Sequence, residues 1–210
     1  MKKNILLILL LLTPLLMQAA PLSQQQKQTV IANINKAVSG LQSMSCSFVQ
    51  TKQMKMLNDK MTSRGQMHYK QGNKLRWEYT TPYKYLFIFN GTKVYVGNKA
   101  KKDVIDTNSN KVFREVARIM MNTVTGKALS NKADFTTDVA SSGNSWVVTL
   151  VPKKRDLRNM FSKIQLLFNK SNYMISEVNI FEKNGDKSNI KMQGISTNKA
   201  INESVFAIPR

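Results

Sequence analysis

The chain has 210 residues, a formal net charge of +20 from 32 basic and 12 acidic side chains, one cysteine and one histidine. A single cysteine excludes an internal disulfide, and Cys46 and His68 stand in no metal-ligand spacing. The few carboxylates form no cluster for acid and base catalysis, and no glycine-rich phosphate loop occurs. We therefore expect a binding protein that is not an enzyme and uses neither metal nor cofactor.

The N-terminal segment is typical of a secretory signal peptide. Two lysines precede a run of leucine and isoleucine over residues 5–12, and Ala19 and Ala20 supply small residues for cleavage. The apolar run is too short to favour a membrane anchor. We expect residues 1–19 to be removed by cleavage near Ala19/Ala20, which leaves one domain over 20–210. Because no cysteine follows the run, we expect a soluble periplasmic protein that is not itself lipidated.

The charge of the mature chain, about +18 without the two leader lysines, suggests an anionic partner. Export argues against nucleic acid, and the basic residues are spread along the chain instead of forming one arm. An anionic membrane surface or an acidic protein fits better. A generally basic exported protein with no single charged site remains an alternative.

The first part of the mature chain predicts one helix followed by strands. Ser23 and Gln26 form a capping box, apolar residues then recur at helical spacing, and Gly40 marks the end. From Ser45 the period changes to two, and the Asn90-Gly91 pair signals a two-residue hairpin. Six strands are predicted near residues 45–56, 62–70, 74–80, 83–89, 92–97 and 101–106.

Helical spacing returns over residues 111–122, and strands then resume near 134–140, 145–152, 161–169, 173–182 and 187–195. About eleven consecutive antiparallel strands predict a strongly curled sheet, and two amphipathic helices need an apolar face to cover. The fold class is thus mainly β with α: an incomplete antiparallel β-barrel with helices covering its mouth. Periodicity alone leaves open whether the interior is packed or holds an apolar cavity.

Several segments carry a resemblance to a known family. Residues 65–79 read GQMHYKQGNKLRWEY and are followed by Pro82, an apolar strand and FNGTKVYVGN; MSCSFVQTKQ opens the strands and AINESVFAIP closes the chain. These segments resemble the periplasmic outer-membrane lipoprotein carrier family (LolA-like) over nearly the whole mature chain. The resemblance implies an apolar cavity beneath a helical lid. It also implies a carrier that shelters acyl chains of lipoproteins, or of similar lipids, and shuttles them from inner to outer membrane.

The resemblance also implies roles for individual residues. Leu75 falls where the family has an apolar side chain important for handing over cargo, and Trp77 matches a family tryptophan. Where the family typically has an Arg-Pro turn whose arginine latches the lid, this chain has Gln71 and Gly72. Gln71 is therefore the candidate latch, without charge assistance. The predicted cavity wall consists of Phe48, Met67, Leu75, Trp77, Tyr79, Leu86, Ile88, Val94, Val116, Ile119 and Met120.

The implied partners follow from the same resemblance. They are an acylated lipoprotein or lipid as cargo, an inner-membrane lipoprotein-releasing transporter as donor and an outer-membrane acceptor as receiver. We expect a monomer. Two alternatives stay open: a lipid-sensing regulatory module of the envelope, or a carrier for a different acylated export product.

Overall fold

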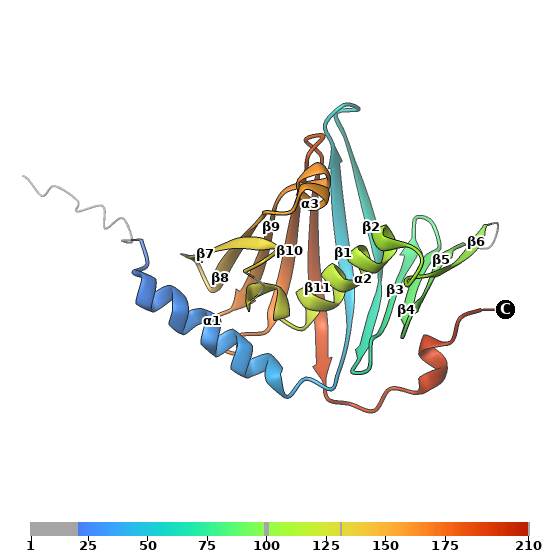
Figure 1. Ribbon diagram of the computed structural model, residues 1–210, viewed down its shortest axis with the longest axis horizontal. Helices are drawn as coiled ribbons and strands as arrows, with labels where there is room; N and C mark the ends of the chain where they lie inside the picture. Colours follow the sequence, from blue (N-terminus) through green and yellow to red (C-terminus); the bar gives the residue numbers. More distant parts are fainter. Residues whose placement is uncertain (1–20, 99–100, 131, 210) are drawn as a thin grey trace, which may run out of the picture.

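A computed structural model of the chain describes residues 21–98, 101–130 and 132–209 (Figure 1), so the predicted signal peptide and its cleavage site lie outside the described residues. Within these ranges, no helix is long and apolar enough to cross a membrane. The described residues form one sheet, three α-helices and two short 3-10 helices. In chain order these are α1 (Gln24–Ser39), β1 (Ser43–Met54), β2 (Asp59–Lys70), β3 (Lys74–Thr81), β4 (Tyr85–Asn90), β5 (Lys93–Gly97), β6 (Lys102–Asp106), α2 (Lys111–Val124), η1 (Lys127–Ser130), β7 (Phe135–Ser142), β8 (Ser145–Pro152), α3 (Arg155–Met160), β9 (Phe161–Asn169), β10 (Ile175–Glu182), β11 (Lys187–Thr197) and η2 (Glu203–Phe206).

The eleven strands form a single antiparallel sheet in the order β6-β5-β4-β3-β2-β1-β11-β10-β9-β8-β7. The first and last strands of the chain meet at the centre of the sheet, because β1 pairs with both β2 and β11. The edge strands β6 and β7 do not pair with each other, so the sheet curls without closing. Figure 1 shows α2 crossing in front of the central strands and α1 running along one end of the sheet. The predicted incomplete barrel is confirmed.

The two long helices begin where the sequence predicts. Ser23 and Gln26 form the capping box of α1, whose buried face includes Ile34, and Gly40 caps its end. The side chain of Asn110 accepts a hydrogen bond from the backbone N–H of Phe113 at the start of α2. Both helices place apolar residues in the core on the concave side of the sheet.

The predicted two-residue hairpin is present, with its turn one residue later than expected. Asn90 is the last residue of β4 and pairs with Lys93, so Gly91 and Thr92 form the turn. Gly91 has φ of +67°, a left-handed conformation that glycine adopts without steric cost.

The C-terminal segment covers the outer, convex face of β3 and β4, which sequence reasoning did not predict. Phe206 is fully buried there, and so is Ile88 of β4. Glu203 forms ion pairs with Lys70 at 2.6 Å and Lys74 at 2.5 Å. Hydrogen bonds from these two lysines lower the pKa of Glu203 to about 2. The segment therefore carries its own small core, on the side of the sheet away from the helices.

Candidate functional site

An apolar cavity of about 390 Å³ lies between the concave face of the sheet and α2. Its wall combines strands from both halves of the chain, because the β1–β11 pairing brings them together. We call it the apolar cavity. It is lined by Gln50, Lys52, Trp77, Tyr79, Tyr85, Phe87, Ile119, Met120, Thr123, Phe161, Ile164, Val178, Ile180, Glu182, Ser188, Ile190 and Met192.

Aromatic rings form one side of the apolar cavity. The Trp77 ring stacks on Phe48 with the ring centres 4.3 Å apart, and Tyr79 meets Phe48 edge-on at 5.2 Å. Phe48 lies opposite Gly65 on the neighbouring strand, and a Cβ atom at Gly65 would come within 2.5 Å of the Phe48 ring. Glycine is therefore needed at position 65 for the Phe48 ring to lie flat beneath the cavity wall.

The roof of the apolar cavity is one face of α2. Ile119, Met120 and Thr123 line it, and Thr123 follows the other two by one helical turn. The flexible thioether of Met120 on the roof, with that of Met192 on the wall, can adapt to ligands of irregular shape. The helix therefore covers the cavity and contributes part of its wall.

A polar group marks one end of the apolar cavity. Lys52 Nζ lies 2.9 Å from Glu182 Oε1 and 3.5 Å from Asp186 Oδ2. The hydrogen bond to Glu182 raises the pKa of Lys52, so this lysine stays charged. The Tyr79 hydroxyl donates to Gln50 Oε1 at 2.7 Å. The Lys52–Glu182 and Tyr79–Gln50 pairs thus occupy part of the cavity wall, whose other lining residues are mainly apolar.

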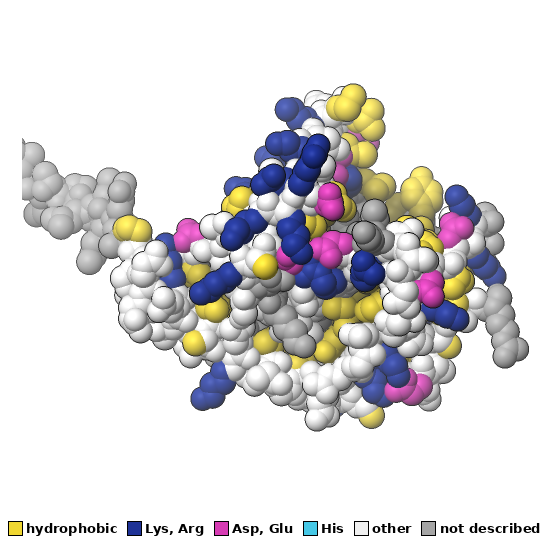
Figure 2. Space-filling model, in the orientation of Figure 1, with side chains coloured by type: hydrophobic (Ala, Val, Ile, Leu, Met, Phe, Trp, Pro, Cys, Tyr) yellow, Lys and Arg dark blue, Asp and Glu magenta, His cyan; other side chains and the backbone are white. Residues whose placement is uncertain are grey.

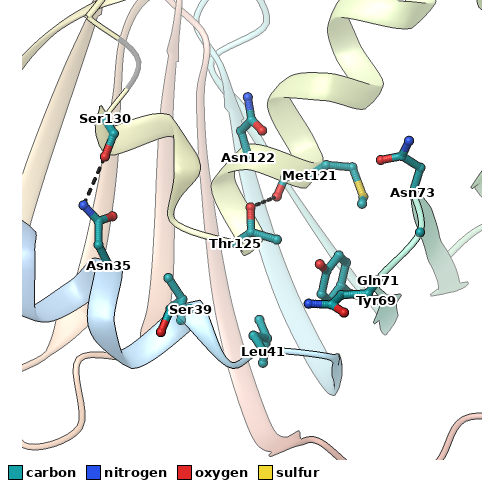
Figure 3. Close-up of a pocket in the computed structure, with 12 residues that line it drawn as sticks. Asn35, Ser39, Leu41, Tyr69, Gln71, Asn73, Met121, Asn122, Thr125 and Ser130 are labelled. Carbon is teal, nitrogen blue, oxygen red and sulfur yellow. Dashed lines mark hydrogen bonds between the residues drawn. The ribbon is translucent and has the colours of Figure 1, made fainter.

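A second cavity, of about 600 Å³, lies on the other side of α2 (Figure 3). We call it the polar cavity. None of the described residues that line it carries a charged side chain, although the chain as a whole is strongly basic. Tyr69, which is buried, shares its wall with Gln71, and both lie across from Thr125 in Figure 3. Its lining residues are Asn35, Val38, Ser39, Leu41, Tyr69, Gln71, Gly72, Asn73, Met121, Asn122, Thr125 and Ser130.

An ion-pair cluster fastens α2 to the start of β7. Asp134 is only 2% exposed, and its carboxylate accepts Arg118 of α2 at 2.5 Å and Lys154 at 2.6 Å. Arg118 also pairs with Glu115 one turn earlier on the helix. These contacts fix the position of α2 against the segment before β7, and no pattern in the sequence predicts them.

Comparison with known proteins places this architecture in a family. The family model described as "Outer membrane lipoprotein carrier protein LolA" matches residues 39–209. The chain belongs to this family. It is 24% identical over 194 residues to an outer-membrane lipoprotein carrier protein of Chromobacterium violaceum, covering 90% of this chain and 87% of that protein.

Solved structures with low identity show the same fold. An uncharacterized conserved protein from Thermus thermophilus superposes with a TM-score of 0.52 at 8% identity, covering 87% of this chain and 94% of that chain. MucB superposes with a TM-score of 0.50 at 8% identity, covering 89% of this chain and 64% of that chain. At such identities the likeness is one of fold alone.

Only some of the predicted wall residues line the apolar cavity. Trp77, Tyr79, Ile119 and Met120 line the apolar cavity. Phe48, Met67, Leu75 and Val94 are packed in the core on the same face of the sheet and line neither cavity. The side chain of Val116 lies outside the described residues.

Leu86 and Ile88 lie outside the cavity, and their placement is a correction. Trp77 pairs with Phe87 across β3 and β4, so Phe87 shares the concave face and its neighbours point to the convex face. Ile88 is buried there beneath the C-terminal segment, and Leu86 is half-buried. The predicted strand was right, but the face assigned to its residues was wrong, because both faces of β4 are apolar.

Sequence reasoning missed the half of the cavity wall that comes from β9, β10 and β11. Alternating apolar residues in these strands could have identified it, since they repeat the pattern used for the first strands. They line the cavity because β11 lies beside β1. These residues are Ile164, Val178, Ile180, Ile190 and Met192.

The single cysteine and the single histidine lie apart from the apolar cavity and do not line it. Cys46 is buried, and burial raises the pKa of its thiol to about 12. His68 Nδ1 lies 2.9 Å from Ser45 Oγ, and burial, then the nearby Arg76, lower the histidine pKa. Among the described residues, no group of three or more His, Cys, Asp or Glu side chains could hold a metal ion. Membership of a carrier family agrees with a binding role.

Proposed function

We propose that the protein is a periplasmic carrier that holds the acyl chains of a lipoprotein, or of a similar lipid, in the apolar cavity. It would receive this cargo from an inner-membrane lipoprotein-releasing transporter and deliver it, as a monomer, to an acceptor at the outer membrane. The observation that carries the proposal is the apolar cavity between the sheet and α2. Family membership and the lipoprotein carrier of Chromobacterium violaceum support the nature of the cargo.

The physical need for such a carrier is large. Each methylene group that enters water costs roughly 0.8 kcal/mol, so two or three acyl chains cost on the order of tens of kcal/mol. An apolar wall of aromatic and branched side chains removes most of this cost. The two polar pairs, Lys52–Glu182 and Tyr79–Gln50, leave most of the wall to apolar side chains.

The size of the cavity makes α2 a movable part in this proposal. Its volume, about 390 Å³, is near the lower end of the roughly 300–1,000 Å³ typical of small-molecule sites. A multiply acylated lipoprotein needs more room, which an outward shift of α2 would provide. Because the closed helix must be displaced, its contacts weaken net binding, and a carrier needs that weakness to release its cargo.

The test is hydrocarbon occupancy of the mature protein, purified from the periplasm without detergent. We expect an environment-sensitive apolar dye to bind and a fatty acid to displace it, and solvent extraction with mass spectrometry to recover acyl lipid. An interior that binds neither dye nor lipid would contradict the proposal. Transfer of a labelled lipoprotein from inner-membrane to outer-membrane vesicles separates a carrier from a lipid-sensing regulatory module, which would bind the lipid without moving it.

A further inference from the structure

Three segments meet at one end of the sheet. They are the turn between β1 and β2 (residues 55–58), α3 with its preceding loop, and the turn between β10 and β11 (residues 183–186). The backbone N–H of Lys55 donates to Asp186 Oδ1 at 3.0 Å, and that of Lys183 donates to the Met160 carbonyl at 3.0 Å. Hydrogen bonds thus hold the three segments together as one surface, which we call the basic end.

The basic end exposes apolar side chains at its tip. Met56 is 91% exposed and Leu57 is 70% exposed, both in the β1–β2 turn, with Met61 and Met160 beside them. The other exposed large hydrophobic residues of the described chain, Tyr83, Tyr85, Val104 and Val151, belong to other segments. A gathering of exposed apolar side chains marks an interaction site more often than isolated ones do.

Cations surround this apolar tip. Figure 2 shows dark-blue side chains gathered over the part of the molecule where α3 lies in Figure 1, with yellow side chains above them. Asp59 and Asp156 are the exposed carboxylates of the basic end. The exposed cations of the same surface are Lys55, Lys60, Lys153, Lys154, Arg155, Arg158, Lys183 and Lys187.

The apolar cavity reaches the same end of the molecule. Phe161, which lines it, directly follows α3, and Lys52 at its polar end pairs with Asp186 in the β10–β11 turn. A surface that binds the basic end therefore lies next to the cavity.

We propose that the basic end binds directly to an anionic lipid bilayer. Met56 and Leu57 insert at the boundary between head groups and acyl chains, while the surrounding lysines and arginines contact lipid phosphates. Exposed apolar side chains flanked by cations have the composition of peripheral membrane-binding surfaces. Because the cations are spread around a protruding turn instead of lining a groove, a flat anionic surface fits them better than a folded acidic partner.

This inference goes beyond carriage of lipid through the aqueous space, because it requires no protein acceptor. Docking would bring the end of the apolar cavity to the bilayer, so that hydrocarbon passes between bilayer and cavity with little exposure to water. Membrane binding and hydrocarbon binding remain separate properties, since the tip residues Met56 and Leu57 do not line the cavity. A variant can therefore lose membrane binding and keep hydrocarbon binding, or the reverse.

The test of the apolar tip is co-sedimentation of the mature protein with vesicles of phosphatidylcholine alone, or mixed with phosphatidylglycerol. We expect binding to the mixed vesicles that weakens with salt, and a loss on the order of tenfold for the double variant Met56→Ser, Leu57→Ser. The matched control is Val104→Ser, which removes an exposed apolar side chain elsewhere and should bind as wild type does. Absent binding, or equal binding to both kinds of vesicle, would overturn the inference.

The test of the charges uses two pairs of reversals with the same change in net charge. Each cation near an anionic surface strengthens binding about fivefold. The variant Lys60→Glu, Lys183→Glu at the basic end should therefore bind at least about 25-fold more weakly. The control Lys93→Glu, Lys199→Glu changes exposed lysines away from the basic end and should lose much less. Equal losses would mean that total charge alone drives binding, and binding only when a membrane protein is added would favour a protein acceptor; either result overturns the inference.

Discussion

The two cavities on either side of α2 differ in chemistry although they share one helix. The apolar cavity is walled by aromatic and branched side chains and takes Ile119, Met120 and Thr123 from the helix. The polar cavity is larger, has amide and hydroxyl groups on its wall, and takes Met121, Asn122 and Thr125 from the same helix. The larger volume of the polar cavity therefore does not make it the proposed lipid site, because acyl chains are stabilised only where apolar surface replaces water around them.

The comparison also assigns separate roles to the parts of the molecule near α2. In the proposed function the aromatic wall binds hydrocarbon; the Arg118–Asp134 pair fastens the helix, and the turn carrying Gln71 faces the end of the helix across the polar cavity. Variants in the packed core, in the Arg118–Asp134 pair and in the turn should therefore differ in their effects on protein stability and on hydrocarbon affinity.

The largest expected effect concerns Leu75, which is fully buried and lines neither cavity. Leu75→Ala should lower the free energy of unfolding by about 2–5 kcal/mol, because it leaves a void in a packed core. Ile119→Ala, at the cavity roof, should lower it less, since that side chain already borders empty space. Urea denaturation of both variants measures the difference. A stable Leu75→Ala protein with impaired hydrocarbon binding would instead support the cavity-wall role predicted from the sequence.

An intermediate effect is expected from Arg118→Met, which removes the charged hydrogen bond between α2 and the buried Asp134. The closed state should lose about 1.5–3 kcal/mol. Hydrocarbon affinity should then rise by about tenfold per 1.4 kcal/mol lost, while the melting temperature of the empty protein falls. Dye titrations and thermal melts test this, with Arg114→Met as a control on the same helix. A fall in affinity would mean that α2 does not have to move to admit ligand.

The smallest expected effect comes from Gln71→Arg, which should lower hydrocarbon affinity where Arg118→Met raises it. The side chain of Gln71 makes no hydrogen bond to any described residue, although it faces the end of α2 across the polar cavity. In Gln71→Arg, a charged donor would reach the last carbonyls of the helix and stabilise the closed state by about 1 kcal/mol or more. Hydrocarbon affinity should fall by about five- to tenfold and the melting temperature should rise. Gln66→Arg, an exposed position in β2, is the control; if both variants behave as wild type does, position 71 is no latch.

Much of the fold was predictable because local chemistry determines it. The capping box of α1, the alternation in the strands and the glycine of the β4–β5 turn each act over a few residues, and each prediction is confirmed. The six-residue helix α3 was missed, since one buried leucine, Leu157, gives too little periodicity to recognise.

The site was less predictable because it depends on contacts between distant segments. Leu86 and Ile88 were assigned to the wrong face because the C-terminal segment buries the convex side of β4, which makes both faces apolar. The walls from β9 to β11 depend on the pairing of β1 with β11, and the fastening of α2 depends on Asp134. Neither interaction leaves a periodic signal in the sequence.

The central claim is that hydrocarbon binds on one side of α2 and not on the other, and a matched pair of variants on that helix tests it most directly. Ile119→Asp places a carboxylate in the apolar cavity, where desolvation costs several kcal/mol, whereas Asn122→Asp places the same group in the polar cavity. Titration with one apolar dye should show at least about a hundredfold loss of affinity for Ile119→Asp and affinity close to wild type for Asn122→Asp. Equal losses in the two variants, or a loss confined to Asn122→Asp, would contradict the account.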